Sequence, residues 1–161
     1  MTAPGIHIDI PTQQLRFTDG SGRGRGYAVS TAANGAGERN GSLCTPRGRH
    51  VVRARIGGGA RPNAVFVARR PTGELYRPEM RADFPDRDWI LTRILWLSGT
   101  EPGFNRLGDV DTMRRFIYIH GAPDDVPMGN PGSHGCIRMR NRDIIELFDR
   151  VPVGTPVVIE A

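Results

Sequence analysis

The sequence predicts one mainly β domain, spanning residues 1–161, with a single clear helix near the C-terminus. Glycine (21 residues) and proline (13 residues) together make about a fifth of the chain, which suits short strands joined by tight turns and disfavours an all-helical fold. Several segments alternate apolar and polar residues, as half-buried strands do. Residues 141–151 clearly space their apolar side chains as a helix does.

The expected strands follow one another from the N-terminus. Residues 6–10 and 15–17 alternate isoleucine, leucine and phenylalanine with polar residues, so the chain opens with a strand and its hairpin partner. Further strands are expected at 27–30, 50–56, 64–68, 116–120, 136–139 and 157–159. Residues 34–48 are rich in glycine and are expected to form a surface loop.

The helix is expected to begin at Asn141, because asparagine is a favoured N-terminal cap. Its apolar face is formed by residues three and four apart, so that they lie on one side of the helix. These residues are Ile144, Leu147, Phe148 and Val151. The helix is therefore expected to pack this face against the sheet.

Residues 71–110 are harder to interpret. Proline and glycine punctuate the stretch, which we expect to be a lid-like insertion that packs over a cleft. Its apolar run, residues 90–97, fits a helix or a strand, because periodicity does not separate the two in so short a segment. Trp89 and Trp96 are expected to pack in the core or in the lid.

All 22 basic residues are arginine, and they outnumber the 17 acidic residues to give a net charge of +5. The first 80 residues carry 12 arginines against 5 acids. Such a basic half attracts nucleic acid or a small anionic substrate. The chain lacks an arginine block and a Cys/His finger spacing, so we expect a solvated basic surface and no nucleic-acid partner.

The sequence shows no signal for export and none for membrane insertion. The first fifteen residues contain no arginine or lysine, and His7 and Asp9 interrupt the early apolar run. No apolar run approaches the ~18 to 20 residues that a membrane helix needs. A cytoplasmic location is expected, with a periplasmic one as the alternative if the sequence lacks its export signal. Both cysteines are expected to be free thiols there, and Cys44 is given no role.

The segment from His120 to Met139 contains the residues best suited to chemistry. His120-Gly121 ends a predicted strand, and the string Ser133-His134-Gly135-Cys136 leads into another. A thiol attacks as the thiolate, which a nearby imidazole can hold as an ion pair. We expect a strand ending at His120 and a strand beginning at Cys136 to bring a Cys/His dyad to the same end of one sheet.

The residues around Cys136 suggest how a substrate would be held. Gly135 has no Cβ, so the amides of Gly135 and Cys136, with His134, are candidates for an oxyanion hole. Arg138 shares a strand face with Cys136, and its planar fork suits a carboxylate. Ser133 and Arg138 are the expected substrate-binding residues. A zinc site made by His120, His134 and Cys136 would lack a fourth ligand, so no metal is expected.

The His120-Gly121 pair and the string from Ser133 to Met139 resemble the L,D-transpeptidase catalytic domain, also called the YkuD domain. The opening Ile-x-Ile-Asp-Ile and the closing Gly-Thr-Pro-Val are also similar to that family. The resemblance implies a YkuD-like mixed β-sheet sandwich or barrel and no cofactor. It also implies that Cys136 is the nucleophile, that His120 is the general base and acid in preference to His134, and that the Gly121 carbonyl orients the imidazole.

In that family the cysteine attacks the carbonyl of the L-centre of a diamino acid in a peptidoglycan stem peptide, releases D-alanine and leaves a thioester. Because no export signal is visible, we expect an L,D-carboxypeptidase that trims tetrapeptides during peptidoglycan recycling. The alternatives are an L,D-transpeptidase that forms crosslinks or exchanges D-amino acids, and a non-catalytic murein-binding domain. Carbapenem-type β-lactams are expected to acylate Cys136.

Overall fold

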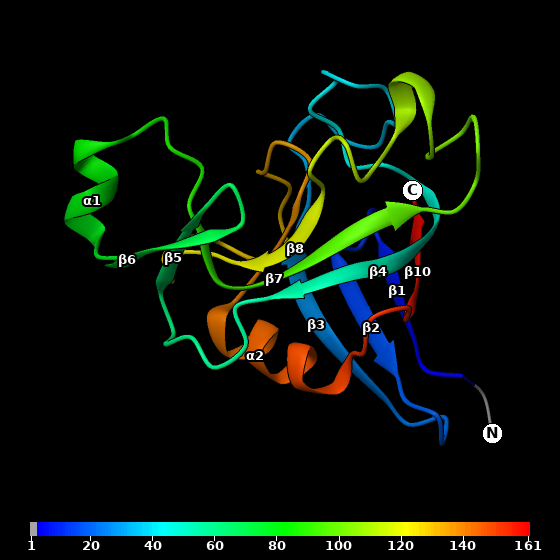
Figure 1. Ribbon diagram of the computed structural model, residues 1–161, viewed down its shortest axis with the longest axis horizontal. Coiled ribbons are helices and arrows are strands. Elements are labelled where there is room, and N and C mark those ends of the chain that lie inside the picture. The colour runs from blue at the N-terminus through cyan, green and yellow to red at the C-terminus, as the bar shows by residue number, and fades with distance from the viewer. Residues whose placement is uncertain (1–2) are drawn as a thin grey trace.

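The computed structural model describes residues 3–161 and has the mainly β architecture that the sequence predicts (Figure 1). The strands are β1 (Gly5–Asp9), β2 (Gln14–Thr18), β3 (Gly24–Ser30), β4 (Gly48–Ile56), β5 (Ala64–Val67), β6 (Arg70–Leu75), β7 (Ile90–Gly99), β8 (Tyr118–Gly121), β9 (Ile137–Met139) and β10 (Pro156–Glu160). The helices are α1 (Pro78–Asp83), the short 3-10 helix η1 (Gly108–Val110) and α2 (Asn141–Arg150).

Eight of the strands close into a barrel. They follow the order β4-β10-β1-β2-β3-β9-β8-β7, and β7 pairs again with β4. The pairs β1–β10 and β8–β9 are parallel, and the other barrel pairs are antiparallel. Closure leaves these strands without an exposed edge for other chains to pair with. The β5–β6 hairpin continues the sheet outside the barrel, where β5 pairs with the first residues of β7.

The core lies inside the barrel and continues under α2. Alternate residues of the strands point inward, as the hydrophobic pattern predicts, and Ile8, Leu15 and Val29 are fully buried there. The apolar face of α2 joins the same cluster, and this helix contacts β7 and β8 (Figure 1). Burial of this face gives a hydrophobic contribution that fixes the helix against the two strands.

Asn141 is the first residue of α2 and does not cap it, contrary to expectation. Arg140 occupies the cap position, and no side chain makes a capping hydrogen bond there. The Asn141 side chain instead accepts a hydrogen bond from Thr92 Oγ1 at 2.6 Å and donates to Asn63 Oδ1 at 3.0 Å. Asn141 therefore ties the start of α2 to β7 and to the loop before β5.

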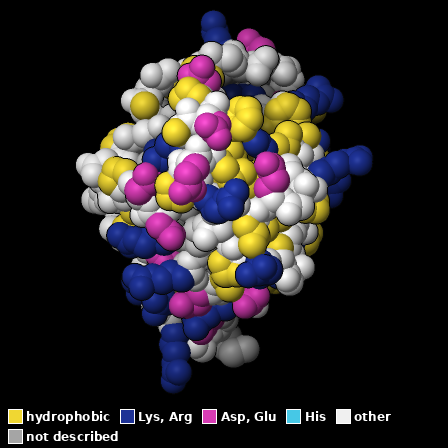
Figure 2. Space-filling model, turned by 90° about the vertical axis from the view of Figure 1, so that its left-hand side faces the viewer, with side chains coloured by type: hydrophobic (Ala, Val, Ile, Leu, Met, Phe, Trp, Pro, Cys, Tyr) yellow, Lys and Arg dark blue, Asp and Glu magenta, His cyan; other side chains and the backbone are white. Residues whose placement is uncertain are grey.

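The expectation that residues 71–110 form one insertion is wrong for its second half. Residues 90–99 are β7, which lies in the barrel wall between β4 and β8. The β5–β6 hairpin, α1 and the connection to β7 project from the barrel on the side away from the N-terminus (Figure 1). On this face, arginine and acidic side chains are mixed with exposed hydrophobic ones (Figure 2). Within residues 3–161, no helix has the length and apolar character needed to span a bilayer.

Candidate active site

His120 and Cys136 lie on adjacent parallel strands. In the β8–β9 register, Ile119 is opposite Ile137 and His120 is opposite Arg138, so Cys136 lies beside the start of β8. The expectation that the end of β8 meets the start of β9 is therefore wrong, because the starts of the two strands lie side by side when the strands are parallel. Strand alternation still places His120 and Cys136 on the same face as diagonal neighbours.

The Cys136 sulfur lies against the backbone of the chain just before and at the start of β8. The Tyr118 amide donates to Sγ at 3.3 Å, and the thiol donates to the Phe116 carbonyl at 3.3 Å. Burial raises the pKa of the thiol to about 12, although the Tyr118 amide and the positive charge of Arg115 act in the opposite direction. The thiol is therefore protonated at neutral pH.

His120 is completely buried, and its ring is held in one orientation. Its Nδ1 lies 2.6 Å from the Gly121 carbonyl oxygen, which only accepts hydrogen bonds, so Nδ1 carries the proton. Its Nε2 is buried and has no partner among residues 3–161. Burial lowers the pKa of His120, so the ring is neutral and Nε2 has a free lone pair. This is the protonation state that a general base needs.

The two pKa shifts argue against the resting ion pair that the sequence suggests. Burial favours the neutral form of both groups, raising the pKa of Cys136 and lowering the pKa of His120. Both groups therefore favour their neutral forms at rest. A thiol and a neutral imidazole can serve as nucleophile and general base.

The turn before Cys136 depends on glycine. Gly135 has a φ of +130°, and a Cβ there would lie 3.0 Å from Ile117 Cδ1 and 3.2 Å from the Cys44 carbonyl oxygen. The Gly135 carbonyl accepts a hydrogen bond from Thr45 Oγ1 at 2.9 Å. The loop that ends at β4 therefore lies against this turn and supports its conformation.

Ser133 stabilises the turn from within. Its hydroxyl accepts the Gly135 amide at 3.2 Å and donates to the Cys136 carbonyl at 2.5 Å. The Gly135 amide is thus occupied, whereas the amides of His134 and Cys136 have no acceptor among residues 3–161. These two amides are the oxyanion-hole candidates that the geometry leaves free, and Ser133 shapes the turn instead of facing substrate.

Two cavities meet beside Cys136. The thiol cavity, of about 430 Å³, is lined by Cys136, Tyr118, Arg69, Arg115, Asp88 and His134, among others. The arginine cavity, of about 570 Å³, is lined by Arg138, Arg81, Trp89, Asp125, Asp88 and His134, among others. Because Asp88 and His134 line both cavities, the two spaces adjoin at these residues. His134 is therefore a wall of the site.

Arg138 reaches the arginine cavity from β9. Its Nη2 donates to Ser30 Oγ at 2.9 Å, and its buried Nε has no partner among residues 3–161. None of the ion pairs within that range involves Arg138. Burial lowers its pKa, and the negative charge of Asp88 acts against that shift. Arg138 is thus a partly desolvated cation with hydrogen-bonding capacity left for a carboxylate.

The sequence offers no signal for three other residues of the site. Asp88 precedes Trp89 in the projecting segment, and its negative charge acts to raise the pKa of both His120 and Cys136. Arg69 and Arg115 also line the thiol cavity. None of the three belongs to a motif, because the fold alone brings the β5–β6 turn, the segment before β7 and the segment before β8 together.

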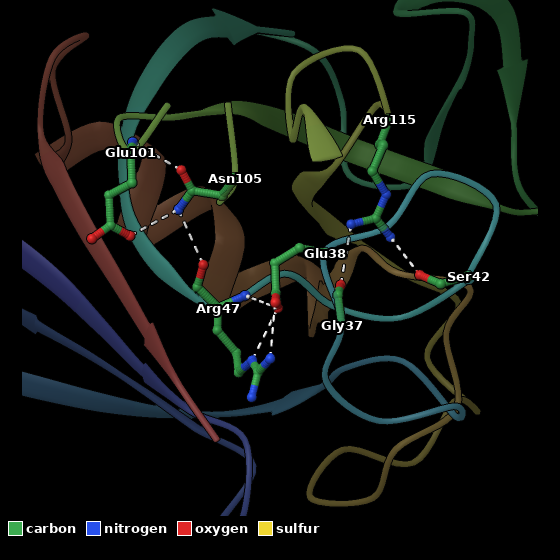
Figure 3. A network of polar contacts seen from close by, with 7 residues as sticks. All are labelled: Gly37, Glu38, Ser42, Arg47, Glu101, Asn105 and Arg115. Carbon is green, nitrogen blue, oxygen red and sulfur yellow. Dashed lines mark hydrogen bonds and ion pairs between the residues drawn. The ribbon is translucent and has the colours of Figure 1, made fainter. Parts of the chain in front are cut away.

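Arg115 connects the thiol cavity to the glycine-rich loop. Its Nη1 donates to the Gly37 carbonyl at 3.2 Å, and its Nη2 donates to Ser42 Oγ at 3.3 Å (Figure 3). Its Nη2 also donates to the Cys44 carbonyl at 2.6 Å. The same loop is fixed further along by the ion pair between Arg47 and Glu38, at 2.8 Å (Figure 3). Arg115 therefore holds the loop that backs the Gly135 turn, and Cys44 contributes its carbonyl.

The donors around Cys136 do not form a metal site. The Nδ1 atom of His120 is bound to the Gly121 carbonyl, and the Cys136 sulfur contacts backbone groups. Among residues 3–161, no three histidine, cysteine or acidic side chains are grouped as metal ligands would be. The thiol of Cys136 and the free Nε2 of His120 are groups that can act as a nucleophile and a base.

Comparison with known proteins gives matches that agree with one another. The model of the L,D-transpeptidase catalytic domain (YkuD) family matches residues 3–159. The probable L,D-transpeptidase YbiS of Escherichia coli K12 is 51% identical over 43 residues, which are 27% of this chain and 14% of that protein. The probable L,D-transpeptidase ErfK/SrfK of Salmonella typhimurium is 53% identical over 45 residues, 28% of this chain and 15% of that protein. The chain thus matches only a short part of these longer relatives.

Solved structures share the fold. L,D-transpeptidase 3 of Mycobacterium tuberculosis, in complex with a faropenem-derived adduct, aligns with a TM-score of 0.60 and 16% identity over 99% of this chain and 62% of its own. The L,D-transpeptidase of Xylanimonas cellulosilytica aligns with a TM-score of 0.56 and 21% identity over 99% of this chain and 61% of its own. At such identities, the likeness concerns the architecture.

Proposed function

Because the chain belongs to the L,D-transpeptidase catalytic-domain (YkuD) family, we propose that it transfers the acyl group of peptidoglycan stem peptides through a thioester on Cys136. One observation carries this proposal. His120 lies on the same face as Cys136, diagonally across two parallel strands, with Nδ1 bound to the Gly121 carbonyl and Nε2 unpartnered. This is the arrangement of a nucleophile, a base and a group that orients the base.

In the first half-reaction, the Cys136 thiol attacks the carbonyl carbon of the L-centre and a C–S bond forms. The thiol proton passes to Nε2 of His120, and the carbonyl oxygen becomes an oxyanion that faces the free amides of His134 and Cys136. When the intermediate collapses, His120 returns the proton to the nitrogen of the terminal D-alanine. The C–N bond breaks, D-alanine leaves and the thioester remains on Cys136.

In the second half-reaction, we place an amine as the acyl acceptor in the arginine cavity. Arg138 and Asp88 both line this cavity, and neither forms an ion pair among residues 3–161. An unpaired cation and an unpaired anion suit an amino-acid centre that carries both an amino group and a carboxylate. The amine nitrogen attacks the thioester carbonyl and gives its proton to His120. The C–S bond then breaks, His120 returns the proton to the sulfur, and a new amide is left, which is crosslinking or D-amino-acid exchange.

The L,D-carboxypeptidase reaction is the second candidate. It uses the same thioester with water as the acceptor, giving a tripeptide and restoring the thiol. The exposed Asp88 side chain between the two cavities leaves the site accessible to water, and the free Nε2 of His120 can take a proton from water as well as from an amine. The acceptor therefore decides between two outcomes of one mechanism.

Product analysis separates these possibilities. The protein is incubated with a diaminopimelate-containing tetrapeptide, with and without D-methionine, and the products are weighed by mass spectrometry. Release of D-alanine with incorporation of D-methionine supports acyl transfer to an amine, and tripeptide alone supports hydrolysis. No change of the peptide with the wild-type protein would overturn both and leave a non-catalytic murein-binding domain. The Cys136→Ala protein serves as the blank.

A β-lactam gives a second readout of the same thiol. Related L,D-transpeptidases have been solved with imipenem, with a faropenem-derived adduct and as an avibactam carbamoyl enzyme. We expect a carbapenem to add its mass to the wild-type protein and not to Cys136→Ala, since the ring carbonyl is attacked as the peptide carbonyl is. Cys44→Ala is the matched control, and it is expected to retain the adduct.

A further inference from the structure

We propose that Arg69 is a specificity-determining residue that binds a free carboxylate of the acyl-donor peptide beside Cys136. The proposal rests on the proposed function and adds the class of donor to it. Donors whose carboxylates near the scissile bond are free would be preferred over donors in which one of these carboxylates is an amide. The observations that carry it are the position of Arg69, its rigid support and its missing counter-ion.

Arg69 is held at the rim of the thiol cavity by a two-residue turn. Val67 of β5 pairs with Arg70 of β6, so Ala68 and Arg69 form the whole loop. Both residues have positive φ, +48° and +65°, at positions where asparagine and glycine are favoured. Because β5 also pairs with β7, the turn is attached to the barrel wall. An arginine kept in an unfavourable backbone conformation beside a nucleophile indicates a functional constraint.

The Arg69 side chain is already ordered before any ligand binds. Its guanidinium carbon lies 4.5 Å from the ring centre of Trp96 and 5.0 Å from that of Phe116. Its Nη1 donates to the hydroxyl of Tyr118 at 2.9 Å. Tyr118 also provides the amide that contacts the Cys136 sulfur, so Arg69 and the thiol are linked through one residue. This support lowers the entropic cost of binding an anion.

Arg69 has no acidic partner. None of the ion pairs among residues 3–161 involves it, and its remaining N–H groups have no acceptor within that range. The second arginine of the cavity, Arg115, is different because its guanidinium donates to two backbone carbonyls and a serine hydroxyl. Asp88 is the acid that lines the cavity, and none of the ion pairs among residues 3–161 joins it to either arginine. Arg69 therefore has free donors for a carboxylate, which binds a guanidinium in a bidentate manner.

The donor peptide offers two carboxylates close to the scissile bond. One belongs to the side chain of the diamino acid and stays with the acyl-enzyme, and the other is the terminal carboxylate of D-alanine and leaves with it. Both present the same chemistry to Arg69. Three tetrapeptides distinguish them: one with both carboxylates free, one with the diamino acid as its carboxamide, and one with a C-terminal carboxamide.

The test compares kcat/KM for release of the C-terminal residue by wild type, Arg69→Met and Arg69→Lys. With wild type, we expect one carboxamide peptide to be turned over about tenfold or more less efficiently than the free acid. Arg69→Met is expected to lower kcat/KM for the free acid by a similar factor, mainly through KM, and to leave that carboxamide peptide unchanged. Arg69→Lys is expected to recover part of the preference, since it keeps the charge without the fork.

Arg55→Met is the matched control. Arg55 is also stacked on an aromatic ring, 4.1 Å from the centre of Phe148, and it donates to the Phe148 carbonyl at 2.8 Å. It lines neither cavity, so the variant removes the same charge and the same kind of contact away from the site. Its preference among the three peptides is expected to match that of wild type. A melting curve of each variant checks that it is folded.

Binding of the same peptides to Cys136→Ala, measured by calorimetry, makes the proposal independent of turnover. Tighter binding of the free acid, abolished by Arg69→Met in that background, supports the carboxylate contact even if no peptide is turned over and the proposed function fails. The proposed contact would be overturned if Cys136→Ala bound all three peptides equally and wild type turned all three over equally. That result would leave the proposed function intact. An equal loss with all three peptides in Arg69→Met would also overturn it.

Discussion

The two faces of strands β8 and β9 serve different purposes although they alternate residue by residue. The inward side chains of Ile119, Ile137 and Met139 are completely buried in the barrel core. The opposite face carries His120, Cys136 and Arg138. Cys136 lines the thiol cavity and Arg138 lines the arginine cavity, while His120 is fully buried. Because neighbouring residues point to opposite faces, a one-residue shift in register would turn the apolar side chains outward and the reactive ones into the core. The comparison teaches that the apolar face sets the position of the reactive one.

The largest expected effect comes from removing the sulfur on the outward face. Cys136→Ala should lower the rate of D-alanine release by about 10⁴-fold or more, because no thioester can form. The thermal midpoint should change little, since the side chain faces the cavity and not the barrel core. Mass spectrometry of products and a melting curve check both. Turnover that survives in this variant would mean that Cys136 is not the nucleophile.

The complementary change on the inward face should act on stability. Ile137→Ala removes a fully buried side chain and should lower the free energy of unfolding by about 2 to 5 kcal/mol. Val153→Ala is the matched control, because Val153 is 57% exposed and should cost about 0.5 kcal/mol or less. Urea denaturation measures both. A loss in Ile137→Ala no larger than in the control would contradict the division between the faces.

Two buried histidines, His50 and His120, differ in whether both ring nitrogens have hydrogen-bond partners. His50 is on β4, outside both cavities, with Nδ1 on the Gly48 carbonyl and Nε2 on Thr112 Oγ1, each at 3.0 Å. Both of its ring nitrogens are occupied, whereas Nε2 of His120 is free. Burial lowers the pKa of His50 to about 4. Burial lowers the pKa of His120 as well, so both histidines are expected to contribute to acid stability, whereas only His120 is expected to act in the reaction.

The sign of the His50 effect follows from proton linkage. In the unfolded chain the pKa is near 6.5, so the unfolded state takes up the proton more readily as pH falls. The contribution is complete above pH 6.5 and is lost as pH falls towards 4, by about 3 kcal/mol at about 1.4 kcal/mol per unit. Urea denaturation at pH 7, 5.5 and 4.5 measures this slope. His50→Gln should make this slope shallower, with the remainder due to His120, and an unchanged slope would refute the role of His50.

Local patterns in the sequence predict much of this architecture. Alternation locates the strands, the spacing of apolar residues locates α2, and the Ser-His-Gly-Cys string locates the candidate nucleophile. Pairing between strands is not local. The local sequence of residues 90–97 therefore could not show that this segment is the barrel strand β7. The parallel register of β8 and β9 also depends on the whole barrel, so the relative offset of His120 and Cys136 could not be predicted.

The same reasoning explains what the sequence hides at the site. Arg69 and Asp88 belong to no motif, and only the docking of the β5–β6 turn and the segment before β7 brings them to Cys136. Burial, which sets the protonation state of the dyad, is likewise a property of the folded chain. Residue types alone favoured an ion pair, whereas desolvation favours two neutral groups.

The neutral dyad gives the last prediction, which concerns pH. The base must be unprotonated, and because the pKa of His120 is lowered, the acid limb of kcat/KM should lie below pH 6.5 with a slope of about tenfold per unit. Since the pKa of Cys136 is raised to about 12, kcat/KM should stay level from pH 7 to 9. The matched optical test is absorbance at 240 nm, where a thiolate absorbs. Wild type at pH 7 should absorb no more strongly at this wavelength than Cys136→Ala. A stronger absorbance would show a thiolate and therefore an ion pair, contrary to this prediction.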